Sequence, residues 1–278
     1  MLKLYFIKPN IDILKRSTQL ELCLHLHPHC FSYLILNTEN NQIIDFEKYS
    51  FTNPTNEILL SELKIWFTQN QEILHLSFKV SKVAIFAEIF TVLPEKSEKP
   101  AEVFEMLGYN IKPDTSIFKD KIEDNFFVYY QLDDELIRFL DNQVVNAEFY
   151  CGDSGLLRFY NNRIAYKSYL AAYVYGEDLV ICHKKDNHNY YYNRFKIKAK
   201  EDLLYYLQLA YEQLGLDKNE YPTYLYGFIE EKSPMYSTSY SYIRNFEIDR
   251  TLKNTLPFLY AVEDFPLHYF VNLWGLVL

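Results

Sequence analysis

The sequence predicts an α/β protein whose two halves carry the same order of elements: three strands, a helix, a strand and a helix. Three features of the chain indicate this fold class. Runs of alternating apolar and polar residues recur in both halves, and polar turn residues separate them. An amphipathic helical pattern then follows the third strand of each half. The repeat is one of element order, because no repeated residues accompany it.

The clearest helix is predicted at residues 201–214, where apolar residues recur every three or four positions and so share one helical face. They are Leu203, Leu207, Ala210 and Leu214. Glu201 and Asp202 lie in the first turn, where the helix dipole favours negative charge. Gly215 follows the last apolar position, as a helix stop commonly does. The strand predicted at 190–197 leads directly into this helix.

The first half opens with a leader segment at 1–17, expected as an edge strand, and continues into a strand at 19–27. This strand alternates, so its leucines share one face and its polar residues the other. The leucines are Leu20, Leu22, Leu24 and Leu26, and the opposite face carries Glu21, Cys23, His25 and His27. Strands at 30–36 and 42–49 complete the three, and Asn53-Pro54 opens a helix.

The remaining elements follow the same alternation of strands and helices. In the first half, extended segments are predicted at 78–87, 89–93, 126–132 and 147–150, helices at 101–107, 133–140 and 154–160, and a polar loop at 108–124. In the second half, strands are predicted at 168–175, 178–184, 190–197, 223–229 and 246–248, with a further helix at 234–243. The predicted domains are a first lobe at 1–162, with the leader and extra strands, and a second lobe at 163–278 that ends in an aromatic segment.

The composition excludes several classes of protein. With 278 residues, 49% apolar and 23% charged, the chain can fold into one large domain or two lobes. A net charge of −9 disfavours nucleic-acid binding. The four cysteines form no C-x-x-C pair. The N-terminus becomes polar too soon for a secretion signal. No run of residues reaches the ~18 apolar residues that a membrane helix needs. These features predict a cytoplasmic protein with reduced thiols and no membrane insertion.

Three antiparallel strands, followed by a helix that crosses over to a parallel strand, form the ribonuclease-H-like unit, and two such units in tandem suggest the actin-like ATPase fold. Several stretches also resemble a known family: Tyr192–Phe195, Glu201–Leu207, Tyr211–Leu214, Leu225–Ile229, Tyr242–Arg244 and Pro266–Phe270, with Phe31–Tyr33 and Val92–Glu95 in the first half. Over most of its length the chain resembles the bacterial family named domain of unknown function 3822, which has an actin-like ATPase fold. The resemblance implies two ribonuclease-H-like lobes and supplies no catalytic residues. The layout is more distantly similar to cell-division and pilus-assembly actin homologues.

The nucleotide segments that this fold implies depart from their usual pattern. In an actin-like ATPase, the turn between the first two strands of each lobe cradles phosphate, with an Asp for the metal and glycines that let backbone N–H groups reach the phosphates. The first-half turn, His25–Cys30, has neither residue type, and Pro28 lacks an N–H. The second-half turn has one glycine, Gly176, and the carboxylates of Glu177 and Asp178 would repel phosphate.

The strand expected to contact adenosine usually ends in paired glycines, and here it has one, Gly227. The sequence therefore predicts no catalytic residue, no metal site and no cofactor. The residues that could still hold a nucleotide in a cleft are His27, His29, Gly176, Glu177 and Gly227, with ATP as the possible ligand.

The histidines and the fold allow two other interpretations. His25 and His27 point to one side of a strand, so a metal ion could bridge them; the alternative is a polar strand face packed under a helix or in the cleft. A ribonuclease-like nuclease needs several carboxylates converging on two metal ions, and the first strand offers only Glu21.

We therefore expect a non-catalytic binding or scaffold module with an unknown protein partner. The alternative is a nucleotide-binding regulator, related to the pilus-assembly or cell-division homologues, with weak or no hydrolysis. The aromatic segment at 256–278, which includes Trp274, is expected either to fold back over the lobe junction or to form a homodimer contact.

Overall fold

A computed structural model describes residues 2–7, 19–51, 56–93, 97, 99–123, 126–164, 168–184, 190–252 and 266–278. The chain divides into two compact units, Met1–Leu156 and Leu157–Leu276, with Val277 assigned to the first and Leu278 to the second. The division falls inside helix α6 (Gly152–Ile164), and the boundary predicted after residue 162 lies in the same helix.

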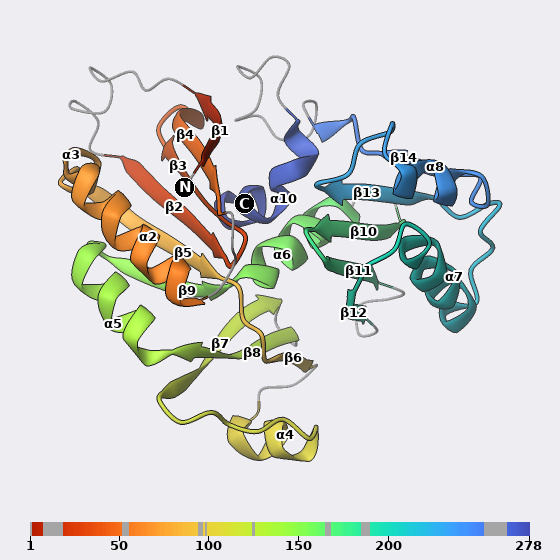
Figure 1. The fold of residues 1–278 in the computed structure, drawn as a ribbon, viewed down its shortest axis with the longest axis horizontal. Helices are drawn as coiled ribbons and strands as arrows, with labels where there is room; N and C mark the ends of the chain where they lie inside the picture. The colour runs from red at the N-terminus through yellow and green to blue at the C-terminus, as the bar shows by residue number, and fades with distance from the viewer. Residues whose placement is uncertain are drawn as a thin grey trace. The chain divides into compact units, whose positions relative to one another are not determined.

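The first unit is built on a six-stranded sheet (Figure 1). Its strand order is β1 (Leu2–Ile7), β4 (Gln42–Ser50), β3 (Cys30–Asn37), β2 (Leu20–His27), β5 (Phe78–Ile85) and β9 (Ala147–Cys151). The strands β2, β3 and β4 form the predicted antiparallel meander, while β5 pairs with β2, and β9 with β5, in parallel. The leader supplies the expected edge strand, because β1 pairs with β4 at one end of the sheet.

Helices α2 (Asn56–Gln69) and α5 (Asp134–Gln143) pack beside each other in this unit, as Figure 1 also shows, because Phe67 and Phe139 meet with ring centroids 5.4 Å apart. The short helix α3 (Gln71–Leu74) follows α2. Trp66 of α2 packs its ring 4.8 Å from Phe31 and 5.1 Å from Tyr33. These two β3 residues pair across the ladder with leucines of β2, so the predicted leucine face is the face that α2 covers.

A second, three-stranded sheet is inserted between β5 and α5. It contains β6 (Phe90–Leu93), β8 (Phe126–Asp133) and β7 (Thr115–Glu123), in that order, and α4 (Pro100–Met106) lies between β6 and β7 in sequence. The prediction of a polar loop over 108–124 is wrong for residues 115–123. These residues form an edge strand, where charged side chains are common and the apolar alternation is weak.

The second unit repeats the topology of the first with a five-stranded sheet. Its order is β12 (Tyr190–Lys196), β11 (Asp178–Lys184), β10 (Leu170–Tyr175), β13 (Thr223–Gly227) and β14 (Phe246–Ile248). In both units the first strand of the meander lies in the middle of the sheet and pairs in parallel with the strand that follows the crossover helix. This shared order confirms the predicted duplication.

The long helix of the second unit is α7 (Asp202–Leu214), and it buries the predicted face against the sheet. Gly215 caps it in the left-handed conformation, with φ of 66°. Helix α8 (Pro234–Tyr240) adds Tyr236 to the same apolar core. The sequence therefore located the core of this unit correctly.

The C-terminal segment is described from residue 266 onward as the 3-10 helix η2 (Leu267–Phe270) and helix α10 (Val271–Val277); the predicted residues 256–265 lie outside the described part. Trp274 is fully buried, and its Nε1 donates a hydrogen bond to the carbonyl of Leu267 at 2.7 Å. The indole of Trp274 therefore offers no surface for a homodimer contact, and a contact through other residues of the segment stays a prediction.

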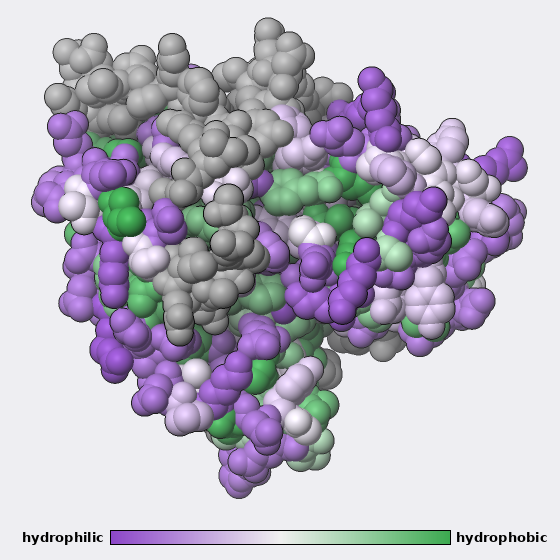
Figure 2. Space-filling model, in the orientation of Figure 1, coloured by the Kyte–Doolittle hydropathy of each residue, from purple (hydrophilic) through white to green (hydrophobic). Residues whose placement is uncertain are grey.

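No helix in the described parts of the chain is long and apolar enough to cross a membrane. On the face drawn in Figure 2, hydrophilic side chains cover most of the surface of α2 and α5, with separate hydrophobic spots between them.

Candidate functional site

The turn between β2 and β3 is closed by its own side chains. His27 and Cys30 face each other across the ladder, so Pro28 and His29 are the turn residues. Proline has no backbone N–H. The N–H of His29 donates to Nδ1 of His27 at 3.2 Å, and the two imidazole rings stack at 5.3 Å. Neither turn residue therefore has a backbone N–H left to donate to a phosphate.

The polar face of β2 is buried. His25 and His27 are each about as inaccessible as core residues, at 4% exposure. Burial, and then the positive charge of Lys48, lowers the pKa of His25 to about 3, so it is neutral at ordinary pH. Burial also raises the pKa of the Cys23 thiol to about 12. Among the described residues, no three His, Cys, Asp or Glu side chains form a group that could hold a metal ion.

The corresponding turn of the second unit is a two-residue hairpin turn between Tyr175 and Asp178. Gly176 has φ of 62°, a conformation that a tight hairpin turn requires and glycine adopts without strain. The carbonyl of Glu177 accepts the N–H of Ile197 at 2.8 Å. Hairpin geometry therefore accounts for this glycine.

Gly227, at the end of β13, is fixed by close packing of two strands. It has φ of 80°, and a Cβ there would lie 1.9 Å from the carbonyl oxygen of Val174 on β10. The N–H of Phe228 donates to the same oxygen at 2.7 Å. Val174 of β10 and Gly227 of β13 are ladder partners, so the turn residues Gly176 and Glu177 lie near Gly227 at the carboxyl ends of these two strands. The other two candidates, His27 and His29, belong to the β2–β3 turn of the first unit.

The chain that follows β13 is packed against the C-terminal segment. The Phe228 ring lies 4.6 Å from that of Tyr175 and 5.2 Å from that of Tyr269 in η2. His268 makes a hydrogen bond through Nε2 to the carbonyl of Ile229 at 3.1 Å, and burial lowers its pKa. The place where an adenosine segment was expected is therefore packed with the protein's own aromatic rings.

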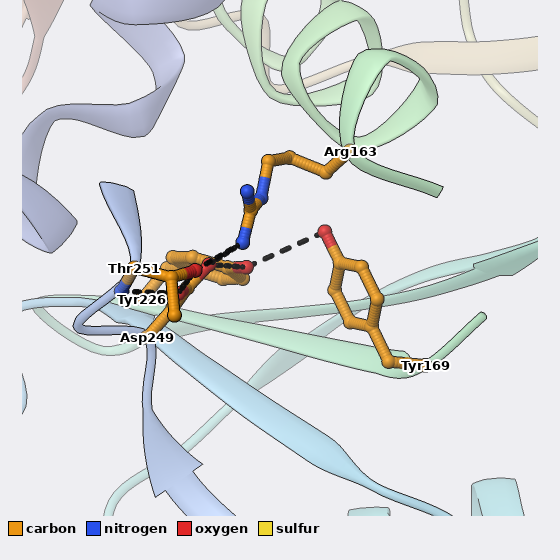
Figure 3. A network of polar contacts seen from close by, with 5 residues as sticks. All are labelled: Arg163, Tyr169, Tyr226, Asp249 and Thr251. Carbon is orange, nitrogen blue, oxygen red and sulfur yellow. Dashed lines mark hydrogen bonds and ion pairs between the residues drawn. The ribbon is translucent and has the colours of Figure 1, made fainter. Parts of the chain in front are cut away.

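A buried polar network in the second unit was not foreseen from the sequence (Figure 3). The Arg163 guanidinium, on α6, lies 2.7 Å from both Asp249 Oδ2 and Thr251 Oγ1. The Tyr226 hydroxyl donates to Asp249 Oδ2 at 2.9 Å, and its oxygen lies 3.3 Å from that of Tyr169. Asp249 Oδ1 accepts the backbone N–H and the hydroxyl of Thr251.

The positive charge of Arg163 and the negative charge of Asp249 shift the pKa values of the groups in this network. Burial alone would lower the pKa of Arg163, but Asp249 and the two tyrosines raise it above its ordinary value. Burial, then Tyr169 and Asp249, raise the pKa of Tyr226 well above its ordinary value, so its hydroxyl remains a donor. The network holds α6 to the end of β14.

The first unit has a comparable buried junction at Asp120 of β7. The Asp120 carboxylate accepts the backbone N–H of Cys151 at 2.7 Å, the hydroxyl of Tyr130 at 2.8 Å and the hydroxyl of Ser154. These bonds fasten the inserted sheet to the end of β9 and the start of α6. A single Asp among the charged residues of β7 gives no sequence signal for this role.

Comparisons with known proteins agree with this topology. The chain is 19% identical to a Bacteroides thetaiotaomicron protein with an actin-like ATPase fold and unknown function; the alignment covers 95% of this chain and 97% of that one, with a TM-score of 0.74. It is 12% identical to a chain of the PilM–PilN type IV pilus biogenesis complex, over 92% of this chain and 97% of that one, with a TM-score of 0.63. No curated protein sequence matches the chain.

These structures confirm the predicted fold, two ribonuclease-H-like units in an actin-like ATPase arrangement. The family described as "Protein of unknown function (DUF3822)" matches residues 9–246, and the chain belongs to this family.

Proposed function

We propose that this protein is a non-hydrolysing binding or scaffold module that uses an actin-like ATPase fold to recognise a protein partner. The observation that carries the proposal is the β2–β3 turn, in which Pro28 has no N–H and the N–H of His29 is bonded to His27. Phosphoryl transfer depends on donors and metal ions that stabilise charge on the phosphates. This turn offers no backbone N–H for that purpose.

The second unit supports the same proposal. Its turn places the carboxylates of Glu177 and Asp178 where a phosphate would need positive charge, and Asp178 is paired with Lys196 at 2.8 Å. Gly227 is accounted for by the approach of β13 to β10.

A protein partner is supported by the inserted sheet of the first unit. The end of α4 and the residues after it expose large apolar side chains: Met106 (86% exposed), Leu107, Tyr109 and Ile111. Exposed apolar residues that gather in one stretch are typical of protein interaction sites. PilM, a protein of similar fold, forms a complex with a protein, PilN.

Calorimetric titration of the full chain with Mg²⁺ and ATP, ADP or GTP, together with an ATPase assay, tests the absence of nucleotide chemistry. We expect no heat of binding and no hydrolysis. A hydrolysis rate that Glu177→Ala abolishes, while the exposed-helix control Glu212→Ala retains it, would overturn the proposal. Nucleotide binding without hydrolysis would support the nucleotide-binding regulator instead, because Gly176, Glu177 and Gly227 share one sheet edge.

The partner surface is tested by affinity capture with the wild-type chain, the double variant Met106→Glu/Leu107→Glu, and Ile65→Glu as a control at an exposed apolar residue of α2. We expect one protein to be retained by the wild type and the control and lost with the double variant. Equal capture by all three chains would exclude the α4 region as the partner surface.

A further inference from the structure

We propose that the first unit contains a binding site for a small, neutral, largely apolar molecule that carries one hydrogen-bond acceptor. A cavity of about 190 Å³ lies between β2, α2, the end of β5, the start of β7, β8 and α5. Its apolar wall includes Leu26, Leu59, Ile85, Leu132 and Leu136, and its polar wall includes Gln131. The inference is separate from the proposed function: Pro28 of the β2–β3 turn lines the cavity, but the ligand would be held by the Gln131 amide and the apolar wall and not by a backbone N–H of that turn.

The cavity occupies a position that suits a ligand. Leu26 and Ile85 are ladder partners at the carboxyl ends of the parallel strands β2 and β5. These two strands are neighbours in the middle of the sheet. In open α/β sheets, ligands bind outside the carboxyl ends of such strands.

The size of the cavity limits the ligand. An apolar cavity of about 150 Å³ holds benzene, whereas sites for drug-sized ligands begin near ~300 Å³. The cavity of about 190 Å³ therefore suits a molecule of roughly six to eight non-hydrogen atoms and is too small for a nucleotide.

Gln131 supplies the specific polar group. It is 6% exposed, and its Nε2 has no hydrogen-bond partner in the described part of the chain. Its Oε1 accepts the backbone N–H of Lys112 at 3.4 Å, which sets the amide with its oxygen toward that donor and leaves Nε2 as the unused donor. Thr115 Oγ1 also lies 3.4 Å from Oε1, but its hydroxyl donates to the carbonyl of Lys112 at 2.7 Å. A buried donor without a partner is costly, so a ligand carbonyl or hydroxyl oxygen would be favoured there.

The charges around the cavity favour a neutral ligand. Three carboxylates line it, and each has a partner: Glu88 pairs with Lys112 at 2.6 Å, Glu135 with Lys64 at 3.5 Å, and Asp133 accepts the first N–H groups of α5. These carboxylates would repel an anionic ligand. A cationic ligand would gain little from them, because each carboxylate already has a partner.

The experiment titrates the full chain with hexanamide, hexanoate and hexylamine and follows backbone amide NMR shifts. Hexanamide is expected to bind at least about tenfold more tightly than either charged analogue, with the largest shifts at residues that line the cavity. Gln131→Leu should weaken hexanamide about five- to tenfold, as the loss of one hydrogen bond does. Gln143→Leu, at an exposed position of α5, should leave its affinity unchanged.

A second variant keeps the proposal testable if Gln131→Leu does not fold. Leu60→Trp, at a partly exposed position in the cavity lining, should fill the cavity and abolish hexanamide binding while the far-ultraviolet circular dichroism is retained. The proposal is overturned if hexanamide produces no saturable shifts, if hexanoate binds equally well, or if Gln131→Leu and Leu60→Trp both bind it like the wild type.

Discussion

The backbone N–H of His29 donates to Nδ1 of His27 across 3.2 Å, so a side chain of the β2–β3 turn occupies the donor that a phosphate would require. The turn is stabilised by its own sequence, with Pro28 fixing one residue and the imidazole bonding the next. A turn closed in this way is suited to packing and poorly suited to anion binding.

Replacing His27 with alanine should release this N–H. We expect hydrogen exchange at the His29 amide to become about tenfold faster in His27→Ala, because the variant lacks the acceptor. His29→Ala is the matched control, since it keeps both the amide and the His27 acceptor and should exchange slowly. Equal exchange rates in the wild type and His27→Ala would show that the bond does not persist in solution.

Gly227 should prove essential for stability rather than for ligand binding. An alanine there would place its Cβ 1.9 Å from the Val174 carbonyl oxygen, in a backbone conformation that only glycine adopts readily. The clash and the backbone strain together should cost about 3 kcal/mol or more of unfolding free energy. Urea unfolding followed by circular dichroism measures this cost.

Gly215→Ala is the control for this experiment. Gly215 also has a positive φ, 66°, but nothing lies within 4 Å of the added Cβ, so only the conformational strain of about 1 kcal/mol should appear. Equal costs for the two substitutions would mean that β13 and β10 adjust their spacing to admit a side chain.

The elements that could be predicted were those whose apolar pattern is local. The stripe of leucines in α7 and the alternation of β2 each identify one buried face within a single element, and the structure buries both. Pro28 also indicated from the sequence that its turn lacks a backbone N–H at that position. Local chemistry therefore predicted the duplicated fold, whereas the bond from the His29 N–H to His27 was seen only in the structure.

What could not be predicted depends on partners distant in sequence. Arg163 and Asp249 are far apart in the chain, and neither lies in a motif that indicates the other. The strand β7 carries charges at several positions because it is an edge strand, so its pattern resembles a loop. The cavity around Gln131 is lined by residues of six helices and strands, so no residue spacing within one of them indicates it.

The pair of Arg163 and Asp249 should contribute strongly to stability because both side chains are almost inaccessible, at 10% and 0% exposure. Asp249→Asn would remove the negative charge and leave a buried guanidinium without its counter-ion. Breaking a buried pair on one side typically costs about 3–5 kcal/mol, and we expect a loss in this range. Guanidinium unfolding monitored by tyrosine fluorescence would measure it.

The exposed pair of Arg250 and Glu231 provides the comparison, since its side chains are 76% and 45% exposed. Glu231→Gln should change the unfolding free energy by less than about 1 kcal/mol, because water and salt screen a surface pair. A loss for Asp249→Asn as small as that of the surface variant would mean that water reaches the buried network.

His25 should make stability depend on pH between about 3 and 6.5. Burial, and then the charge of Lys48, lowers the folded-state pKa of His25 to about 3, whereas the unfolded chain has the ordinary value near 6.5. Below pH 6.5 the unfolded state binds a proton that the folded state does not, so stability falls as pH falls, by at most about 1.4 kcal/mol per pH unit from this group. Lys48, whose pKa burial lowers to about 8, titrates above this window.

Urea unfolding of the wild type and His25→Gln at several pH values from 4 to 7.5 isolates the contribution of this histidine. At pH 7.5 the two proteins should differ by a fixed packing cost of the substitution. As the pH falls toward 4, this difference should shrink or reverse sign, because only the wild type loses stability through His25. Parallel stability curves across the whole range would mean that His25 takes up its proton in the folded state, and hence that the polar face of β2 opens to water.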